Sequence, residues 1–118
     1  DGRFRAELRL PTRTVPWKYG SLVFDPRPVQ IPQNSVLVRS LARNVRRIAG
    51  KVPNVKGLGM FTDASILCNH GGIEACVCGP GGPRCGAHSS VEFIDITDLV
   101  KASRVYAATA IDICGIHS

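Results

Sequence analysis

His88 is the residue whose type and setting could most directly do metal or proton chemistry. It lies in the stretch "GPGGPRCGAHSSVEF", which begins at Gly79, and the acidic Glu92 follows four residues later. Neutral imidazole is the commonest metal ligand, and it can also transfer a proton near neutral pH. Gly79 and Gly81 would let the backbone approach a bound ligand closely. The alternative interpretation is a solvated surface loop that contains a histidine without a functional role.

Five cysteines, at positions 68, 76, 78, 85 and 114, suggest a second chemistry. Cys76, Cys78, Cys85 and His88 could together supply four tetrahedral zinc ligands. The one-residue spacing between Cys76 and Cys78 is too short for a zinc knuckle, and "EACVCG" is more typical of a buried strand with both thiols on one face. An odd number of cysteines also argues against a secreted disulfide framework. We therefore expect a reducing, cytoplasmic compartment.

The charge of the chain is concentrated in its N-terminal half. Residues 1–56 hold twelve Lys/Arg against three Asp/Glu, whereas residues 57–118 hold three against six, for a net charge of +6. A basic half can bind nucleic acid or acidic partners. No aromatic residues interleave with the arginines of residues 39–47 to stack on bases, which argues against nucleic acid and favours a solvated helix face. No apolar run reaches the roughly 18 residues that a membrane helix needs, so we expect no membrane partner.

The helices that must position these residues can be predicted from the periodic spacing of apolar residues. In "NSVLVRSLARNVRRIAG", apolar residues recur every three or four positions, which predicts a helix capped by Asn34 or Ser35 and ended by Gly50. A second, short helix should begin at Thr62 or Asp63 and end at Gly71 or Gly72. The last helix should be capped by Thr97 and ended by Gly115.

Alternating or short apolar runs predict the strands between these helices. They are residues 4–10, an extended edge or connector over residues 20–32, residues 55–58 and residues 73–78. Strand, helix, strand, loop and helix in this order predict an α/β fold with a partial parallel sheet and flanking helices. In such sheets ligands bind beyond the carboxyl ends of the strands. The loop that carries His88 follows residues 73–78 and would lie at that end.

Several short motifs, in order, resemble a known family. They are Thr-Asp-Ala at residues 62–64, Gly-Gly-Ile at 71–73, Gly-Pro-Gly at 79–81 and Ala-His at 87–88. Together they resemble the C-terminal end of the zinc-dependent deacylases and exopeptidases that include acetylornithine deacetylase, succinyl-diaminopimelate desuccinylase and carboxypeptidase G. Upstream, "AELRLP" looks like the strand by which such proteins leave a small lid domain.

The resemblance implies a role for each candidate residue. His88 would be a ligand in a centre of two zinc ions, with cobalt as a possible substitute, where bound water attacks an amide carbonyl. Asp63 and Glu92 would support that ligand, and Gly79 and Gly81 would meet the substrate. Helix capping by Asp63, a solvated acid at Glu92 and a tight turn at the glycines are the structural alternatives. The substrate would be an N-acyl amino acid or a small peptide.

The resemblance also implies a division of the chain and a missing part. Residues 1–20 would be a remnant of the lid, through which the parent could form a homodimer, and residues 21–118 would belong to the catalytic domain. The other metal ligands and the general base have no counterparts here, so we expect them in a missing N-terminal half of the same protein. The chain alone should therefore be an inactive fragment of a hydrolase. A non-catalytic basic domain that binds acidic partners or nucleic acid remains the alternative.

Overall fold

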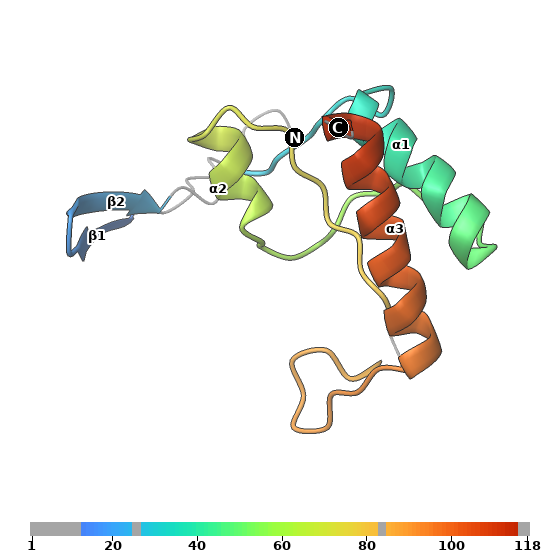
Figure 1. Ribbon diagram of the computed structural model, residues 1–118. Coiled ribbons are helices and arrows are strands. Elements are labelled where there is room, and N and C mark those ends of the chain that lie inside the picture. The colour runs from blue at the N-terminus through green and yellow to red at the C-terminus, as the bar shows by residue number, and fades with distance from the viewer. Residues whose placement is uncertain (1–12, 25–26, 83–84, 116–118) are drawn as a thin grey trace, which may run out of the picture.

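The computed structural model describes residues 13–24, 27–82 and 85–115 (Figure 1). The chain forms first a hairpin and then helices joined by long irregular segments. In order, the elements are β1 (Arg13–Trp17), β2 (Gly20–Phe24), α1 (Val36–Asn44), the π-helix η1 (Val45–Ala49), α2 (Ala64–Asn69) and α3 (Ile96–Cys114). The strand predicted at residues 4–10 lies outside the described residues.

Strands β1 and β2 form an antiparallel hairpin that projects away from the helices (Figure 1). Its register pairs Arg13 with Phe24 at the open end and Trp17 with Gly20 at the turn. Pro16 is compatible with this sheet because both strands of a two-stranded sheet are edges, where a missing N–H is tolerated. The predicted extended stretch is thus a strand only as far as Phe24, and the residues described beyond it, from 27 to 32, are irregular.

The predicted parallel sheet is not formed in the described part of the chain. Residues 55–58 and 73–78 are irregular, and β1 and β2 make up the whole of the described sheet. A strand needs a neighbour to satisfy its backbone groups, and the described residues place none beside either segment. The mixture of helices with strands agrees with the α/β class, but the strand pairing that is present is antiparallel and local.

The predicted helices are present, and local capping explains the start of α1, the end of η1 and both ends of α3. The Ser35 side chain accepts a hydrogen bond from the Val38 N–H at 3.2 Å, and Gly50 ends η1 in the left-handed conformation with φ 67°. Helix α2 ends at Asn69 with His70 as its C-cap, and Gly72, with φ 63°, takes the left-handed conformation two residues later. The prediction that Thr97 caps α3 is wrong: the Asp95 carboxylate accepts from the Thr97 N–H at 2.7 Å. Aspartate is the stronger cap, and it also favours the positive end of the helix dipole.

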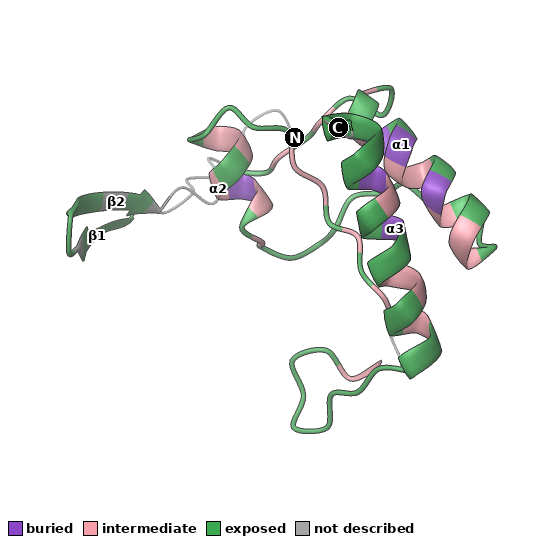
Figure 2. Cartoon of the chain, viewed as in Figure 1, coloured by how far each residue is buried: buried purple, intermediate pink, exposed green. Residues whose placement is uncertain are grey.

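Helices α1 and α3 pack against each other and hold the core (Figure 2). Val38 and Val105 are the buried apolar side chains of the described residues, and Ser40, Asn44 and Thr109 are buried polar residues of the same two helices. The radius of gyration is 18.2 Å, whereas a compact domain of this length would have about 13.5 Å. The core is therefore small, and many large apolar side chains remain on the surface.

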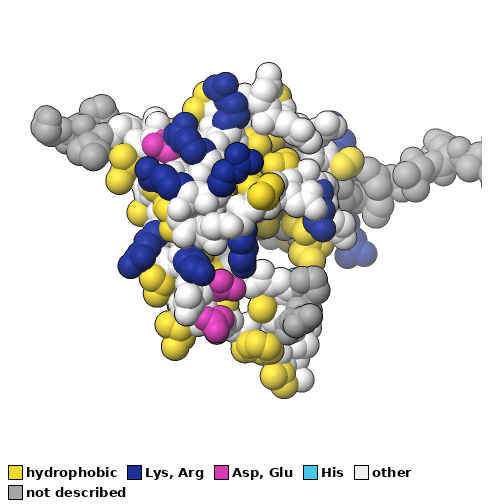
Figure 3. All heavy atoms as spheres, turned by 90° about the vertical axis from the view of Figure 1, so that its right-hand side faces the viewer, with side chains coloured by type: hydrophobic (Ala, Val, Ile, Leu, Met, Phe, Trp, Pro, Cys, Tyr) yellow, Lys and Arg dark blue, Asp and Glu magenta, His cyan; other side chains and the backbone are white. Residues whose placement is uncertain are grey.

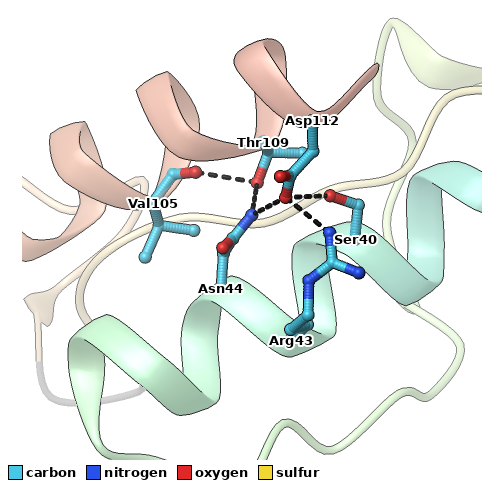
Figure 4. Close-up of polar contacts among 6 residues, drawn as sticks. All are labelled: Ser40, Arg43, Asn44, Val105, Thr109 and Asp112. Atoms are coloured by element: carbon cyan, nitrogen blue, oxygen red, sulfur yellow. Dashed lines mark hydrogen bonds and ion pairs between the residues drawn. The ribbon is translucent and has the colours of Figure 1, made fainter. Parts of the chain in front are cut away.

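A polar cluster joins α1 to α3 (Figure 4). One carboxylate oxygen of Asp112 accepts hydrogen bonds from the Ser40 hydroxyl at 2.8 Å, the Arg43 guanidinium at 2.7 Å and the Asn44 amide at 2.7 Å. The same amide nitrogen donates to the Thr109 hydroxyl oxygen at 3.2 Å, and that hydroxyl donates to a backbone carbonyl of α3. The two helices are thus joined by a connected polar network as well as by two valines.

Acid should weaken this helix pair. The hydrogen bond from Arg43, followed by those from Ser40 and Asn44, holds the pKa of Asp112 well below its usual range. A carboxyl whose pKa is lowered by folding stabilises the fold above its unfolded pKa of about 3.9, and this stabilisation is lost as the pH falls through the folded value. We expect the free energy of unfolding, measured with urea at a series of pH values, to decline below pH of about 4.

An Asp112→Asn variant should show a shallower decline, because its side chain cannot be protonated. Some decline should remain, since the backbone N–H of Thr97 also lowers the pKa of Asp95. Equal pH profiles for the two proteins would contradict the assignment to Asp112.

Candidate functional site

The candidate site is the loop from Cys85 to Phe93, which is closed by hydrogen bonds within its own backbone. The Phe93 N–H donates to the Cys85 carbonyl at 3.1 Å, and the Ser89 N–H donates to the Gly86 carbonyl at 2.8 Å. The Ser89 hydroxyl donates to the Val91 carbonyl at 2.9 Å and accepts from the Val91 N–H at 3.2 Å. The loop is therefore a hydrogen-bonded turn of defined shape at the N-terminal end of α3.

His88 occupies a special backbone position within this loop. Its φ is 64°, and it is the one residue other than glycine with a positive φ in the described chain. Histidine is among the side chains that tolerate this conformation better than most. Gly86 also has a positive φ of 66°, and a β-carbon there would meet the Val91 carbonyl oxygen. The turn thus depends on Gly86, and it leaves the His88 side chain exposed to solvent.

Gly79 and Gly81 belong to the segment that leads into this loop. The Tyr106 hydroxyl of α3 donates to the Cys78 carbonyl at 2.7 Å, which ties the segment to the helix. Gly81 has φ 90°, and a β-carbon there would lie 3.0 Å from the Cys85 sulfur. The Gly82 N–H points to that sulfur at 3.3 Å. A tight turn is therefore one role that Gly81 has in this structure.

Asp63 and Glu92 are both exposed, and neither side chain makes a hydrogen bond or ion pair with another described residue. Asp63 stands at the N-cap position of α2 but makes no capping bond, so the predicted capping role is not seen. Figure 1 shows α2 well separated from the orange segment that contains residues 85–93. The structure therefore keeps Glu92 in the same loop as His88 and places Asp63 elsewhere.

The cysteines do not form the four-ligand zinc arrangement. Among the described residues, no group of three or more His, Cys, Asp or Glu side chains is placed to hold an ion. All five cysteines are free. Burial, and then the neighbouring Cys78 and Cys68, raise the pKa of the Cys76 thiol, and burial raises the pKa of Cys78. These thiols are protonated at neutral pH and behave as the small apolar residues that their spacing indicated.

A comparison with protein families gives a match that extends from residue 16 to residue 112, which is most of the chain. The matching model is that of the peptidase family M20/M25/M40. The chain belongs to this family. Comparisons with curated proteins and with solved structures gave no significant match.

Membership of the M20/M25/M40 family makes the chain part of a group of hydrolases that are generally metal-dependent peptidases. The match includes the candidate loop, the segment that leads into it and most of α3. In the described residues, however, no group of metal-ligating side chains includes His88, so these residues do not form a metal centre by themselves.

Helices in the described part of the chain are all too short or too polar to cross a membrane.

Sequence reasoning missed the hydrogen bond that positions the loop segment. Tyr106 lies on α3, and its hydroxyl reaches a backbone carbonyl that is 28 residues earlier in the chain. Burial, and the nearby Cys78, raise the pKa of this hydroxyl, so it stays protonated and can donate. Tyr106 is 43% exposed, and the periodicity of α3 alone does not say which partner its hydroxyl finds.

Proposed function

We propose that the chain is the C-terminal part of a zinc-dependent amide hydrolase of the acetylornithine deacetylase, succinyl-diaminopimelate desuccinylase and carboxypeptidase G type. Its reaction would be cleavage of an amide bond in an N-acyl amino acid or a small peptide. The observation that carries the proposal is the family match over residues 16–112, which includes the closed loop that presents His88.

His88 would be a ligand to one of two zinc ions in this proposal. Its support is geometric: the side chain is exposed on a turn whose backbone is held by three hydrogen bonds, Phe93 to Cys85, Ser89 to Gly86 and Val91 to Ser89. A ligand on a shaped turn loses little conformational entropy on binding. The other ligands and the general base would come from an N-terminal half of the same protein. Glu92 would support the ligand within the loop, and Asp63 would join it only when that half is in place.

The remaining parts of the proposal concern organisation. Residues 1–20 would belong to the lid through which the parent dimerises, and residues 21–118 to the catalytic domain. The hairpin crosses the boundary between them, since β2 begins at Gly20. The odd number of cysteines, which argues against a secreted disulfide framework, supports a reducing, cytoplasmic compartment. Gly79 and Gly81 would bring the backbone close to the carboxylate end of the substrate.

Titration of the purified chain with zinc, monitored by isothermal calorimetry, tests this assignment. We expect weak binding, because the described residues supply one ligand and not a set. A variant with Cys76, Cys78 and Cys85 replaced by serine should bind equally well. Neither protein should hydrolyse an N-acyl amino acid in the presence of zinc. Tight binding that is lost with the three cysteines would overturn the proposal in favour of a cysteine-based zinc module.

A further inference from the structure

The part of the chain from residue 27 to residue 62 forms a strongly basic surface. This stretch contains seven Lys/Arg residues and no Asp or Glu. Helix α3 supplies two acids to it: Asp112 pairs with Arg43 at 2.7 Å, and Asp98 with Lys51 at 3.7 Å. Figure 3, which faces the side of α1 and α3, shows Lys and Arg side chains gathered there with few acids among them.

Within this surface lies a hollow of about 410 Å³, which we call the arginine hollow. It is lined by Ala42, Arg43, Arg46, Arg47 and Pro53. The three arginines are spaced i, i+3 and i+4 at the junction of α1 and η1, so they project from one face.

Arg46 and Arg47 carry charge that the described structure leaves uncompensated. Both are exposed, and neither forms an ion pair with another described residue. Both also lie one helical turn from Arg43, so an anionic partner would offset the positive charge gathered there.

We propose that the arginine hollow binds an acidic peptide segment. Carboxylates would pair with Arg46 and Arg47, whose planar guanidinium groups can hold a carboxylate with two parallel hydrogen bonds. An apolar side chain of the peptide would contact Ala42, Pro53 and the aliphatic stems of the arginines. This site would act whether or not the loop of His88 binds a metal.

Two observations favour a peptide over nucleic acid. The hollow has no aromatic residue on which a base could stack. The apolar surface of Ala42 and Pro53 also suits a side chain better than a sugar-phosphate chain.

Fluorescence anisotropy with two labelled probes tests the proposal on the full chain. One probe is a peptide of alternating Glu and Leu residues, and the other is a DNA duplex of mixed sequence. The test variant is Arg46→Glu with Arg47→Glu, and Arg46→Gln with Arg47→Gln is a milder form that does not place acids near the helix end. The matched control is Lys101→Glu with Arg104→Glu, which makes the same charge change on α3 outside the hollow. Circular dichroism verifies that all variants keep their helices.

We expect the wild type to bind the peptide more tightly than the duplex, and both arginine variants to weaken peptide binding about tenfold or more. The α3 control should weaken it much less. Equal losses in the arginine variants and the control would overturn the proposal, because net charge alone would then explain binding. Absence of peptide binding by the folded wild type would overturn it too, and tighter binding of the duplex would assign the surface to nucleic acid.

Discussion

Replacing Asn44 with alanine is expected to lower the free energy of unfolding by about 2–3 kcal/mol. Asn44 is 1% exposed, and its amide nitrogen donates to both Thr109 and Asp112 across the interface of α1 and α3. The variant loses one neutral hydrogen bond and one to a charged carboxylate, and no water can readily replace them at a buried position. Val38 and Val105 are the buried apolar side chains of the described chain. This polar network therefore supplies an unusually large share of the free energy that holds α1 against α3.

Urea unfolding followed by circular dichroism measures the change, with Ser103→Ala as the control. Ser103 is exposed on α3, and its hydroxyl donates to the Leu99 carbonyl within the same helix. Its replacement should change the free energy of unfolding by no more than about 0.5 kcal/mol. An Asn44→Ala variant that was as stable as this control would show that the two helices do not pack in solution as they do in the structure.

Replacing His88 with alanine is expected to weaken zinc binding by the chain about tenfold or more, to the level of non-specific sites. The reason is that the family resemblance gives His88 the role of a zinc ligand. No other His, Cys, Asp or Glu side chains of the described residues are grouped with it to hold an ion. Competition with a chromogenic zinc chelator gives the affinity of each protein.

Two further variants make this result specific. His88→Asn lacks the imidazole but suits the φ of 64° better than alanine does, so it separates the loss of a ligand from a change in loop shape. His70→Ala removes another exposed imidazole, at the end of α2. We expect the first to behave like His88→Ala and the second like the wild type. If His70→Ala caused the greater loss, His88 would not be the principal ligand.

The sequence predicted the helices well because their signals are local. The apolar positions of residues 36–49, the cap at Ser35 and the stops at Gly50 and Gly115 act within one or two turns, so the chain needs no distant partner to obey them. The Thr97 cap failed for an equally local reason, since Asp95 lies two residues earlier and is the better acceptor. The short motifs around residues 62–64 and 87–88 likewise indicated the broad family, which the match over residues 16–112 then showed.

Strand prediction failed where pairing depends on other parts of a chain. Residues 73–78 have the composition of a buried strand, but composition supplies no neighbour, and the described residues place none beside them. The candidate site shows the same limit. His88 and Glu92 share a loop because they are close in sequence, whereas the expected approach of Asp63 to His88 requires tertiary packing that the described structure does not contain.

By itself, then, the sequence determined the helices, the behaviour of the thiols as small apolar residues, and the membership of a peptidase family. Each of these depends on side-chain type and short-range spacing. Tertiary structure alone decided that Asp112 would accept hydrogen bonds from Ser40, Arg43 and Asn44, which are about 70 residues away. It also decided that Arg46 and Arg47 would line a hollow with Pro53 and not simply face solvent. These outcomes depend on which helix faces which, and helix packing is set by whole surfaces that no short stretch of sequence contains.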